Sequence, residues 1–287
     1  MTFRLSTWVA AFAFVFTATA NASCPRQFEE GAAPRAVHAA YAVRVHELCY
    51  DAFAVWVSGE TRTPLWSAEH LTSASVAAAR LQPRHDAFHA DANLPRADRA
   101  ELADYVRSGF DRGHLAPSGD MPSARAQQQS YSLANIVPQN ATLNRGLWEE
   151  LEESARLLAM DDGEVYVVTG PVFTGGEPPV LHGRVAVPQA LFKAVYDVRR
   201  NAAAAYVAGN SSPARYEMIS VEQLRNLIGI DVFPALTDLV KSRAVNLLDP
   251  NAHHRDQVAD AGTGMPLPMR RVFDVTETAD RSPRYPN

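Results

Sequence analysis

Apolar residues recur with two different periods along this chain, and each period predicts a different kind of element. Residues 53–57 and 65–69 are short runs rich in apolar residues, and the stretch 59–64 between them contains a glycine and a proline. This pattern is typical of two strands joined by a hairpin turn. Similar runs at 165–169, 190–198 and 203–208 predict further strands.

From residue 143 onward the pattern becomes helical. One apolar stripe has its members three or four positions apart: Leu147, Leu151, Ala155 and Leu158. A second set recurs every four positions and is expected to share another face of the same helix: Asn144, Trp148, Glu152 and Arg156. That face carries an amide, an indole, an acid and a base, which is unusual for a surface that only contacts solvent.

Three shorter signals complete the predicted order of elements. A short helix is expected over 97–107, and Gly109 with Phe110 leads into a strand at 111–114. Ser220 and Gln223 form a capping box that opens a helix ending near Gly229. Beyond residue 249 the chain is rich in proline, glycine and charge, which predicts a loosely packed tail.

The first 22 residues have the composition of an export signal. Arg4 supplies a positive charge, residues 8–16 are apolar, and Ala20-Asn21-Ala22 is a small-x-small cleavage site. The apolar run is shorter than the ~20 residues that a membrane helix needs, although a retained anchor is the alternative interpretation. We therefore expect a periplasmic or secreted protein with no membrane span. Its expected parts are a signal peptide at 1–22, one domain at 23–248 and a polar tail at 249–287.

The two cysteines and the net charge narrow the class of protein. Cys24 and Cys49 are the only cysteines, and an even number in an exported chain favours a disulfide over a zinc site. Loss of residues 1–22 removes one arginine and no acid, so 26 basic against 32 acidic residues leave a charge of −6 instead of −5. The negative net charge argues against a protein that holds nucleic acid through bulk electrostatics. A local track of arginines would suffice for an enzyme that must release its product.

The tetrapeptide Asp111-Arg112-Gly113-His114 is the strongest candidate for chemistry. A histidine can accept a proton from water near neutral pH, and the arginine places a fixed positive charge beside it. The glycine permits close approach of another chain segment. A hydrogen-bonded structural histidine would be the favoured interpretation for His114 in isolation, and the neighbouring residues change that preference.

Asn144 is a candidate metal ligand, because Mg²⁺ accepts few protein oxygens and keeps several waters. In the alternative interpretation Asn144 only caps the helix. An acid two turns along the expected face, Glu152, favours the metal. Arg156 either pairs with Glu152 or contacts phosphate, and spacing alone does not separate these. A base, a metal and an arginine together meet the requirements for cutting a phosphodiester.

Three segments of the chain resemble the DNA/RNA non-specific endonuclease family in their order and spacing. They are Asp-Arg-Gly-His-Leu-Ala-Pro at 111–117, Ser-Leu-Ala-Asn-Ile-Val-Pro-Gln at 132–139 and Leu-Asn-Arg-Gly-Leu-Trp at 143–148. The family includes secreted bacterial sugar-nonspecific nucleases and mitochondrial endonuclease G, and the resemblance runs from about residue 50 to 236. It implies an α+β fold with a central mixed, largely antiparallel sheet flanked by helices. It also implies a ββα-metal finger, in which a strand bearing the histidine packs against the helix bearing the metal ligand.

The resemblance further implies the roles of individual residues. His114 matches the general base, and Asn144 matches the sole direct protein ligand of Mg²⁺, for which Mn²⁺ can substitute because both ions favour octahedral oxygen coordination. Arg84 is expected to bind substrate, in preference to Arg80. The other catalytic positions are the phosphate-contacting Arg112, the site asparagine Asn135, the acid Glu152 that holds a water on the metal, and Arg156, which stabilises the transition state.

The implied function is a metal-dependent endonuclease that cuts DNA and/or RNA into fragments with 5′-phosphate and 3′-hydroxyl ends. Contacts to phosphate rather than to base edges would explain indifference to sequence. One alternative is a catalytically silent nucleic-acid-binding or periplasmic binding protein on the same fold. Another is a phosphodiesterase of small nucleotides, which would need a closed pocket. The sequence leaves the oligomeric state open, and a homodimer is one of the states it allows.

Overall fold

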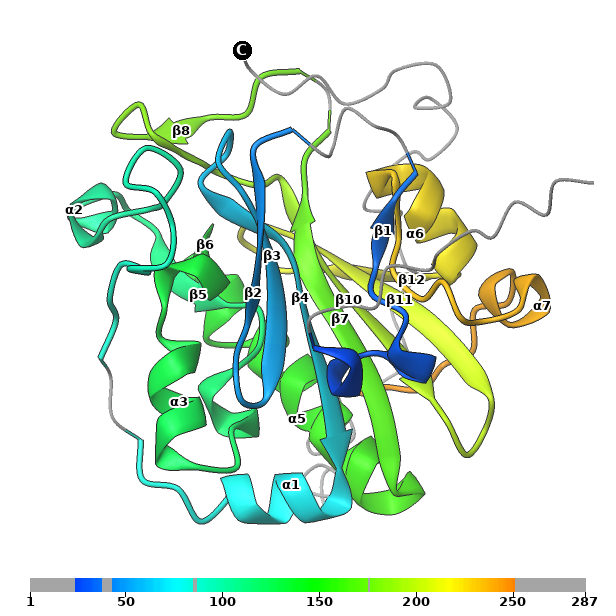
Figure 1. Cartoon of the computed structure of the whole chain (residues 1–287). Helices are drawn as coiled ribbons and strands as arrows, with labels where there is room; N and C mark the ends of the chain where they lie inside the picture. The colour runs from blue at the N-terminus through cyan, green and yellow to red at the C-terminus, as the bar shows by residue number, and fades with distance from the viewer. Residues whose placement is uncertain (1–23, 38–42, 85–86, 175, 251–287) are drawn as a thin grey trace, which may run out of the picture.

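A seven-stranded sheet in which every neighbouring pair is antiparallel forms the centre of the molecule (Figure 1). The computed structural model describes residues 24–37, 43–84, 87–174 and 176–250. In spatial order the strands are β12 (Tyr216–Ile219), β11 (Ala202–Gly209), β10 (Ala190–Asp197), β7 (Glu164–Val172), β4 (Thr63–Thr72), β3 (Phe53–Ser58) and β2 (Val45–Cys49). All of the strands expected from apolar runs are present, and β4 and β7 extend beyond those runs.

Helices and three two-stranded ladders surround this sheet. The helices are α1 (Ser73–Ala79), α2 (Leu102–Tyr105), α3 (Ala124–Ser130), α4 (Ala141–Asn144), α5 (Leu147–Asp162), α6 (Val221–Ile228) and α7 (Asp238–Lys241). The ladders pair β1 (Arg35–Ala36) with β13 (Ile230–Asp231), β5 (Asp111–His114) with β6 (Ile136–Gln139), and β8 (Val180–Leu181) with β9 (Val185–Ala186). Short 3₁₀ turns are η1 (Pro25–Gln27), η2 (Glu29–Gly31), η4 (Ser118–Asp120) and η5 (Leu133–Asn135).

Two of the helix predictions have different outcomes. Helix α6 begins at the expected capping box and ends at Gly229, whose φ of 67° is the left-handed conformation that glycine adopts without strain. The helix expected over 97–107 was too long, because only the single turn of α2 forms. Val106 is already extended after that turn, and Arg107 has a φ of 56°, so the helical path ends there.

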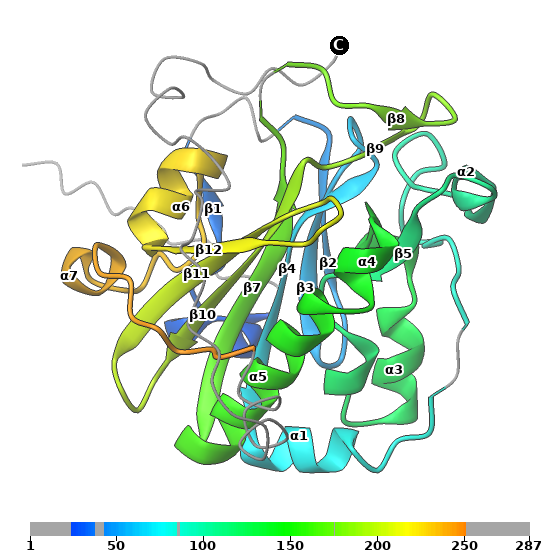
Figure 2. The same ribbon diagram turned by 180° about the vertical axis from the view of Figure 1, so that it is seen from behind.

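Different helices cover the two faces of the sheet. Alternate residues of β10 show the division: Leu191 and Val195 pack with α5, whereas Phe192 and Ala194 pack with α6 and the N-terminal turns. Figure 2 shows α5 lying across its face, with β5 and α4 beside it. This arrangement brings the strand and the helices of the predicted site to the same side of the sheet.

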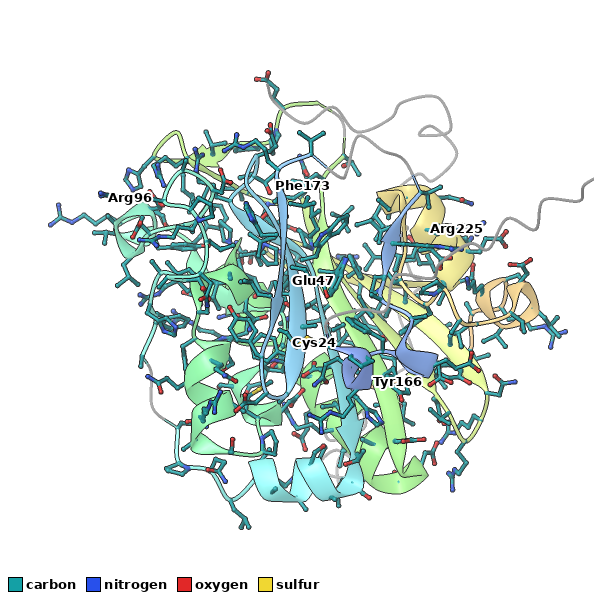
Figure 3. The ribbon with its side chains drawn as sticks, viewed as in Figure 1. Cys24, Glu47, Arg96, Tyr166, Phe173 and Arg225 are labelled. Carbon is teal, nitrogen blue, oxygen red and sulfur yellow. A yellow bond between two sulfur atoms is a disulfide. The ribbon has the colours of Figure 1, made fainter. Side chains whose placement is uncertain are left out.

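A disulfide fastens the N-terminal turns to the edge of the sheet. Cys24 precedes η1 and is bonded to Cys49, the last residue of β2, with Cα atoms 5.7 Å apart (Figure 3). Beside it, the ring of Phe28 meets the edge of Trp66 with centroids 5.8 Å apart. The predicted disulfide is therefore confirmed.

Some predictions concern parts of the chain outside the described residues. The expected signal peptide at 1–22 and all but the first two residues of the expected tail lie there. Within the described ranges, no helix has both the length and the apolar character needed to cross a membrane.

Candidate active site

The predicted base lies on β5, which is paired with β6 so that His114 faces Ile136. The residue before His114 must be a glycine for a steric reason. A Cβ atom on Gly113 would lie only 2.6 Å from the Cβ of Gln139, a fully buried side chain at the end of β6. The close approach expected of this glycine is therefore made by Gln139, and it keeps the two strands in contact beneath the histidine.

The single helix expected from residue 143 onward is broken. Helix α4 ends at Asn144, and α5 begins at Leu147 after Gly146, whose φ of −133° and ψ of −110° are not helical. Asn144 therefore does not share a continuous helix face with Trp148 and Glu152, and that prediction was wrong. The spacing of four residues continues across the break, so periodicity could not reveal it.

Asn144 does not cap a helix either, because the N-caps of α4 and α5 are Asn140 and Gly146. Its Nδ2 instead donates a hydrogen bond of 3.0 Å to Oδ2 of Asp111. The same carboxylate accepts two further bonds of 2.8 Å from Arg145, one at each oxygen. Burial alone would raise the pKa of Asp111, but these hydrogen bonds outweigh it and lower the pKa. An ionised carboxylate only accepts, so it holds the NH₂ group of Asn144 and leaves the amide oxygen for a cation.

The polar face of α5 is turned into the protein. Trp148 is buried, and Arg156 is nearly so. Nη1 of Arg156 donates to Oδ1 of Asp120 at 2.7 Å, and its Nε donates to Oε2 of Glu153 at 2.6 Å. The surface ion pair with Glu152 that spacing allowed does not form. Arg156 is instead fixed from below by carboxylates, with the rest of its guanidinium facing the pocket.

Glu152 lies over a group of buried charges. Burial raises its pKa to about 7, although the positive charges of Lys193 and Arg156 act in the opposite direction. Burial also raises the pKa of Glu69 well above its ordinary value, and the nearby Asp120 adds to this effect. The pocket therefore contains one carboxyl group, that of Glu152, which can hold or release a proton near neutral pH.

Six of the seven predicted site residues line one pocket of about 510 Å³. They are Arg84, Arg112, His114, Asn144, Glu152 and Arg156. These side chains come from β5, α4, α5 and the loop after α1, so residues up to 72 positions apart in sequence meet here. Glu149 and Asp111 line the same pocket, so both acidic and basic side chains face it.

The choice of Arg84 over Arg80 agrees with this geometry. Arg80 donates to Oε1 of Glu153 at 3.2 Å and does not line the pocket. A Cβ atom added to Gly119 would lie 3.7 Å from Nη2 of Arg84 and 3.2 Å from Nη1 of Arg156. Both guanidinium groups thus approach the same glycine, where they can bind one phosphate together.

Asn135 is the exception, because it lies beneath the pocket. Its side chain is fully buried, and its Oδ1 accepts bonds from Oγ of Ser67 at 2.7 Å and from the backbone nitrogen of Ala116 at 3.0 Å. Its Nδ2 donates to the carbonyl oxygens of Ala116 and Ser130. These bonds fix the chain that leaves His114, so the geometry gives Asn135 a positioning role instead of contact with substrate.

Two aromatic residues that the sequence did not single out enclose the histidine. The ring centroids of Phe88 and Tyr131 lie 5.4 Å and 5.0 Å from that of His114. The guanidinium of Arg112 lies over the face of Phe88, with Cζ 4.3 Å from the ring centroid. Phe88 follows a stretch without clear periodicity, so no local signal pointed to it.

Lys193 was also missed, although a lysine in an otherwise apolar strand is a recognisable signal. It lies on β10, is almost fully buried, and donates from Nζ to Oγ1 of Thr169 at 3.0 Å. The same Nζ lies 5.3 Å from the ring centroid of Trp148, one turn of α5 before Glu152. The buried positive charge of Lys193 therefore favours the ionised form of Glu152.

A family model for DNA/RNA non-specific endonucleases matches residues 32–239 of the chain, which contain this entire pocket. The chain belongs to the DNA/RNA non-specific endonuclease family. The resemblance carried by the three sequence segments is thereby confirmed.

Similar proteins agree with this membership. Nuclease C1 of Cunninghamella echinulata var. echinulata is 37% identical over 157 residues, which cover 50% of this chain and 62% of that protein. The mitochondrial nuclease EXOG of Danio rerio is 32% identical over 214 residues, covering 66% and 62% respectively. The chain thus spans about three-fifths of the length of these relatives. The crystal structure of the EndoG/EndoGI complex matches 69% of this chain and 89% of its own with a TM-score of 0.60 at 24% identity, which shows a shared fold.

The residues of this family member fit a hard divalent cation. No group of three or more histidine, cysteine or acidic side chains in the described ranges could hold a metal by itself. The pocket instead offers the oriented amide oxygen of Asn144 with the carboxyl groups of Glu149 and Glu152 nearby. Few protein oxygens and several waters are the environment that Mg²⁺ prefers.

Proposed function

We propose that this protein is a Mg²⁺-dependent endonuclease that hydrolyses DNA and RNA without sequence specificity and leaves 5′-phosphate and 3′-hydroxyl ends. The observation that carries the proposal is the convergence of His114, Asn144 and the three predicted arginines on one pocket. Family membership supports phosphodiester hydrolysis by a metal-dependent enzyme.

Each side chain has a chemical task in this proposal. His114 takes a proton from the water that attacks phosphorus, while its ring is held between Phe88 and Tyr131. Arg112 and Arg156 bind the non-bridging oxygens, where negative charge increases in the transition state. Asn144 would hold the metal ion, with Glu152 accepting hydrogen bonds from waters around it. When bound, Mg²⁺ supplies positive charge that stabilises the phosphate and the departing oxygen.

Contacts confined to phosphate would make cleavage indifferent to base sequence. The negative total charge of the chain is compatible with this, because arginines line the pocket itself: Arg84, Arg112, Arg145 and Arg156. The disulfide supports a periplasmic or secreted location, where thiols are oxidised. We also propose a signal peptide at 1–22, the nuclease domain at 23–248 and the tail at 249–287, and a homodimer stays a prediction.

Incubation of the purified protein with plasmid DNA and with RNA, with Mg²⁺ or with EDTA, tests the proposal. We expect cleavage only with the metal and loss of at least about 100-fold in rate for His114→Ala, the lower range for a positioned base. His70→Ala is the matched control, because that histidine contacts Glu164 and Tyr166 outside the pocket. Binding without cleavage would favour the silent binding protein, and hydrolysis of dinucleotides alone would favour the small-nucleotide phosphodiesterase.

A further inference from the structure

The guanidinium of Arg112 is held differently from those of its neighbours. Its Cζ lies 4.3 Å from the ring centroid of Phe88, within the range of a cation–π contact. Arg145 and Arg156, in the same pocket, donate hydrogen bonds to carboxylates. For Arg112 no hydrogen bond or ion pair to a side chain exists among the residues that the structure describes.

The ring of Phe88 is itself fixed. The next residue, His89, donates from its backbone nitrogen to the carbonyl oxygen of Tyr131 at 3.2 Å and accepts from Leu133 at 2.8 Å. The rings of Phe88 and Tyr131 form a T-shaped pair, with centroids 4.9 Å apart and planes at 89°. Its centroid is also 5.4 Å from that of His114. One rigid aromatic group therefore sets the positions of both the predicted base and the exposed arginine.

The mode of contact decides which donors of the arginine remain free. A carboxylate binds the N–H groups at the edge of a guanidinium, and these are the groups that a phosphate needs. An aromatic ring binds the flat face of the guanidinium through its quadrupole and leaves the edge available. Stacking on Phe88 thus orders the long side chain of Arg112 without competing with substrate.

We propose that Phe88 is a positioning residue that holds Arg112 by its face and presents all of the guanidinium N–H donors to the phosphate being cut. This rests on the proposed function, because it takes Arg112 as a phosphate contact. It assigns a role in substrate binding to a residue that need not touch the substrate. The role depends on the electron density of the ring and not only on its shape.

Fluorinated phenylalanines placed only at position 88 test this dependence. Mono-, di- and trifluorination withdraw electron density in steps and change the shape of the ring little. We expect affinity for a phosphodiester oligonucleotide, measured by fluorescence anisotropy with EDTA present to prevent cleavage, to fall stepwise. The whole series should span about 2- to 5-fold, which corresponds to a cation–π contact at a partly exposed site. Phe88→Leu should bind at least as weakly as the trifluoro protein.

Two matched series separate this role from a structural one. In an Arg112→Gln background the fluorination series should become flat, because the cation is absent. The same fluorinated residues at Phe233, a buried position that packs with Tyr196, should leave binding unchanged. A flat series at Phe88 in the native background, or a slope that persists in Arg112→Gln, would overturn the inference. Plasmid cleavage by the unfluorinated protein decides the proposed function separately, so cleavage with a flat series rejects only the role of Phe88.

Discussion

Single residues in this site take their chemistry from neighbours that are distant in sequence. Asn144 is an example, because Asp111 accepts from its NH₂ group and so decides which atom of the amide faces the pocket. Arg145 shares the same carboxylate with a bidentate contact. The position of one amide oxygen therefore depends on β5, on α4 and on the residue after α4.

This arrangement predicts the behaviour of Asn144→Ala. The variant should lose metal-dependent cleavage, because the amide oxygen that would hold the ion is removed. The fold should survive, because Asn144 caps no helix and one hydrogen bond to a charged group contributes ~1.5–3 kcal/mol. Initial rates against Mg²⁺ and Mn²⁺ concentration measure the effect. Glu152→Ala should be milder, since that residue acts through water, and full activity of Asn144→Ala would place the metal elsewhere.

The raised pKa of Glu152 predicts that the stability of the protein depends on pH. Its pKa of about 7 in the folded protein exceeds its ordinary value of 4.5, so the folded state binds this proton more tightly than the unfolded state. In the absence of metal, the free energy of unfolding should therefore fall as pH rises from 4.5 to 7. Denaturant unfolding in EDTA at pH 5 and pH 8 measures the change.

Glu152→Gln should have a weaker dependence on pH over the same interval. Some dependence should remain, because burial also raises the pKa of Glu69. Glu222→Gln is the control, since that side chain is exposed on α6 and should leave the slope unchanged. Identical slopes for Glu152→Gln and the native protein would contradict this assignment.

At the scale of elements, the contact between β5 and β6 leaves no space for a side chain at residue 113. Gly113→Ala should lower the free energy of unfolding by about 1–3 kcal/mol, the usual effect of excess volume in a close-packed interior, because the new methyl group meets Gln139. Cleavage should fall as well, since His114 is the next residue. The denaturant midpoint and the cleavage rate are the two measurements.

Gly113→Ala combined with Gln139→Gly should recover part of the lost stability, because the obstructing Cβ atom and the rest of the side chain are gone. Gln139→Gly alone measures the cost of its own cavity and of a glycine in the strand. If the double variant were less stable than the sum of the single effects predicts, the steric explanation would fail.

At the scale of the whole molecule, the Cys24–Cys49 disulfide joins the N-terminal turns to the sheet edge across a separation of 25 residues. Thiol titration of the denatured, unreduced protein should find no free sulfhydryl groups. Cys24→Ser with Cys49→Ser should lower the free energy of unfolding by ~3 kcal/mol, the value typical of a loop of this size. Cleavage at moderate temperature should persist, because the bond lies outside the pocket. Two reactive thiols in the native protein would contradict the prediction.

The sequence by itself determined the features that depend on local spacing. Runs of apolar residues located five of the seven strands of the central sheet, and the capping box at Ser220 placed α6, because backbone conformation follows from nearby side chains. The Asp-Arg-Gly-His segment predicted His114 and Arg112 as site residues, and the cysteine count predicted the disulfide. Four of the seven predicted site residues lie within the three short segments: Arg112, His114, Asn135 and Asn144.

Only the tertiary structure decided which side chains meet in the pocket and which support it. Asn135 is buried instead of lining the pocket. Oγ of Ser67 on β4 donates a hydrogen bond to its Oδ1, a contact that no spacing in the sequence predicts. Phe88 and Lys193 reach the site from a loop and a distant strand. Such contacts depend on how the chain closes over long separations, whereas periodicity reports only the local path of the backbone. The break between α4 and α5 at Gly146 is an example, because the apolar and polar spacing continues unchanged across it.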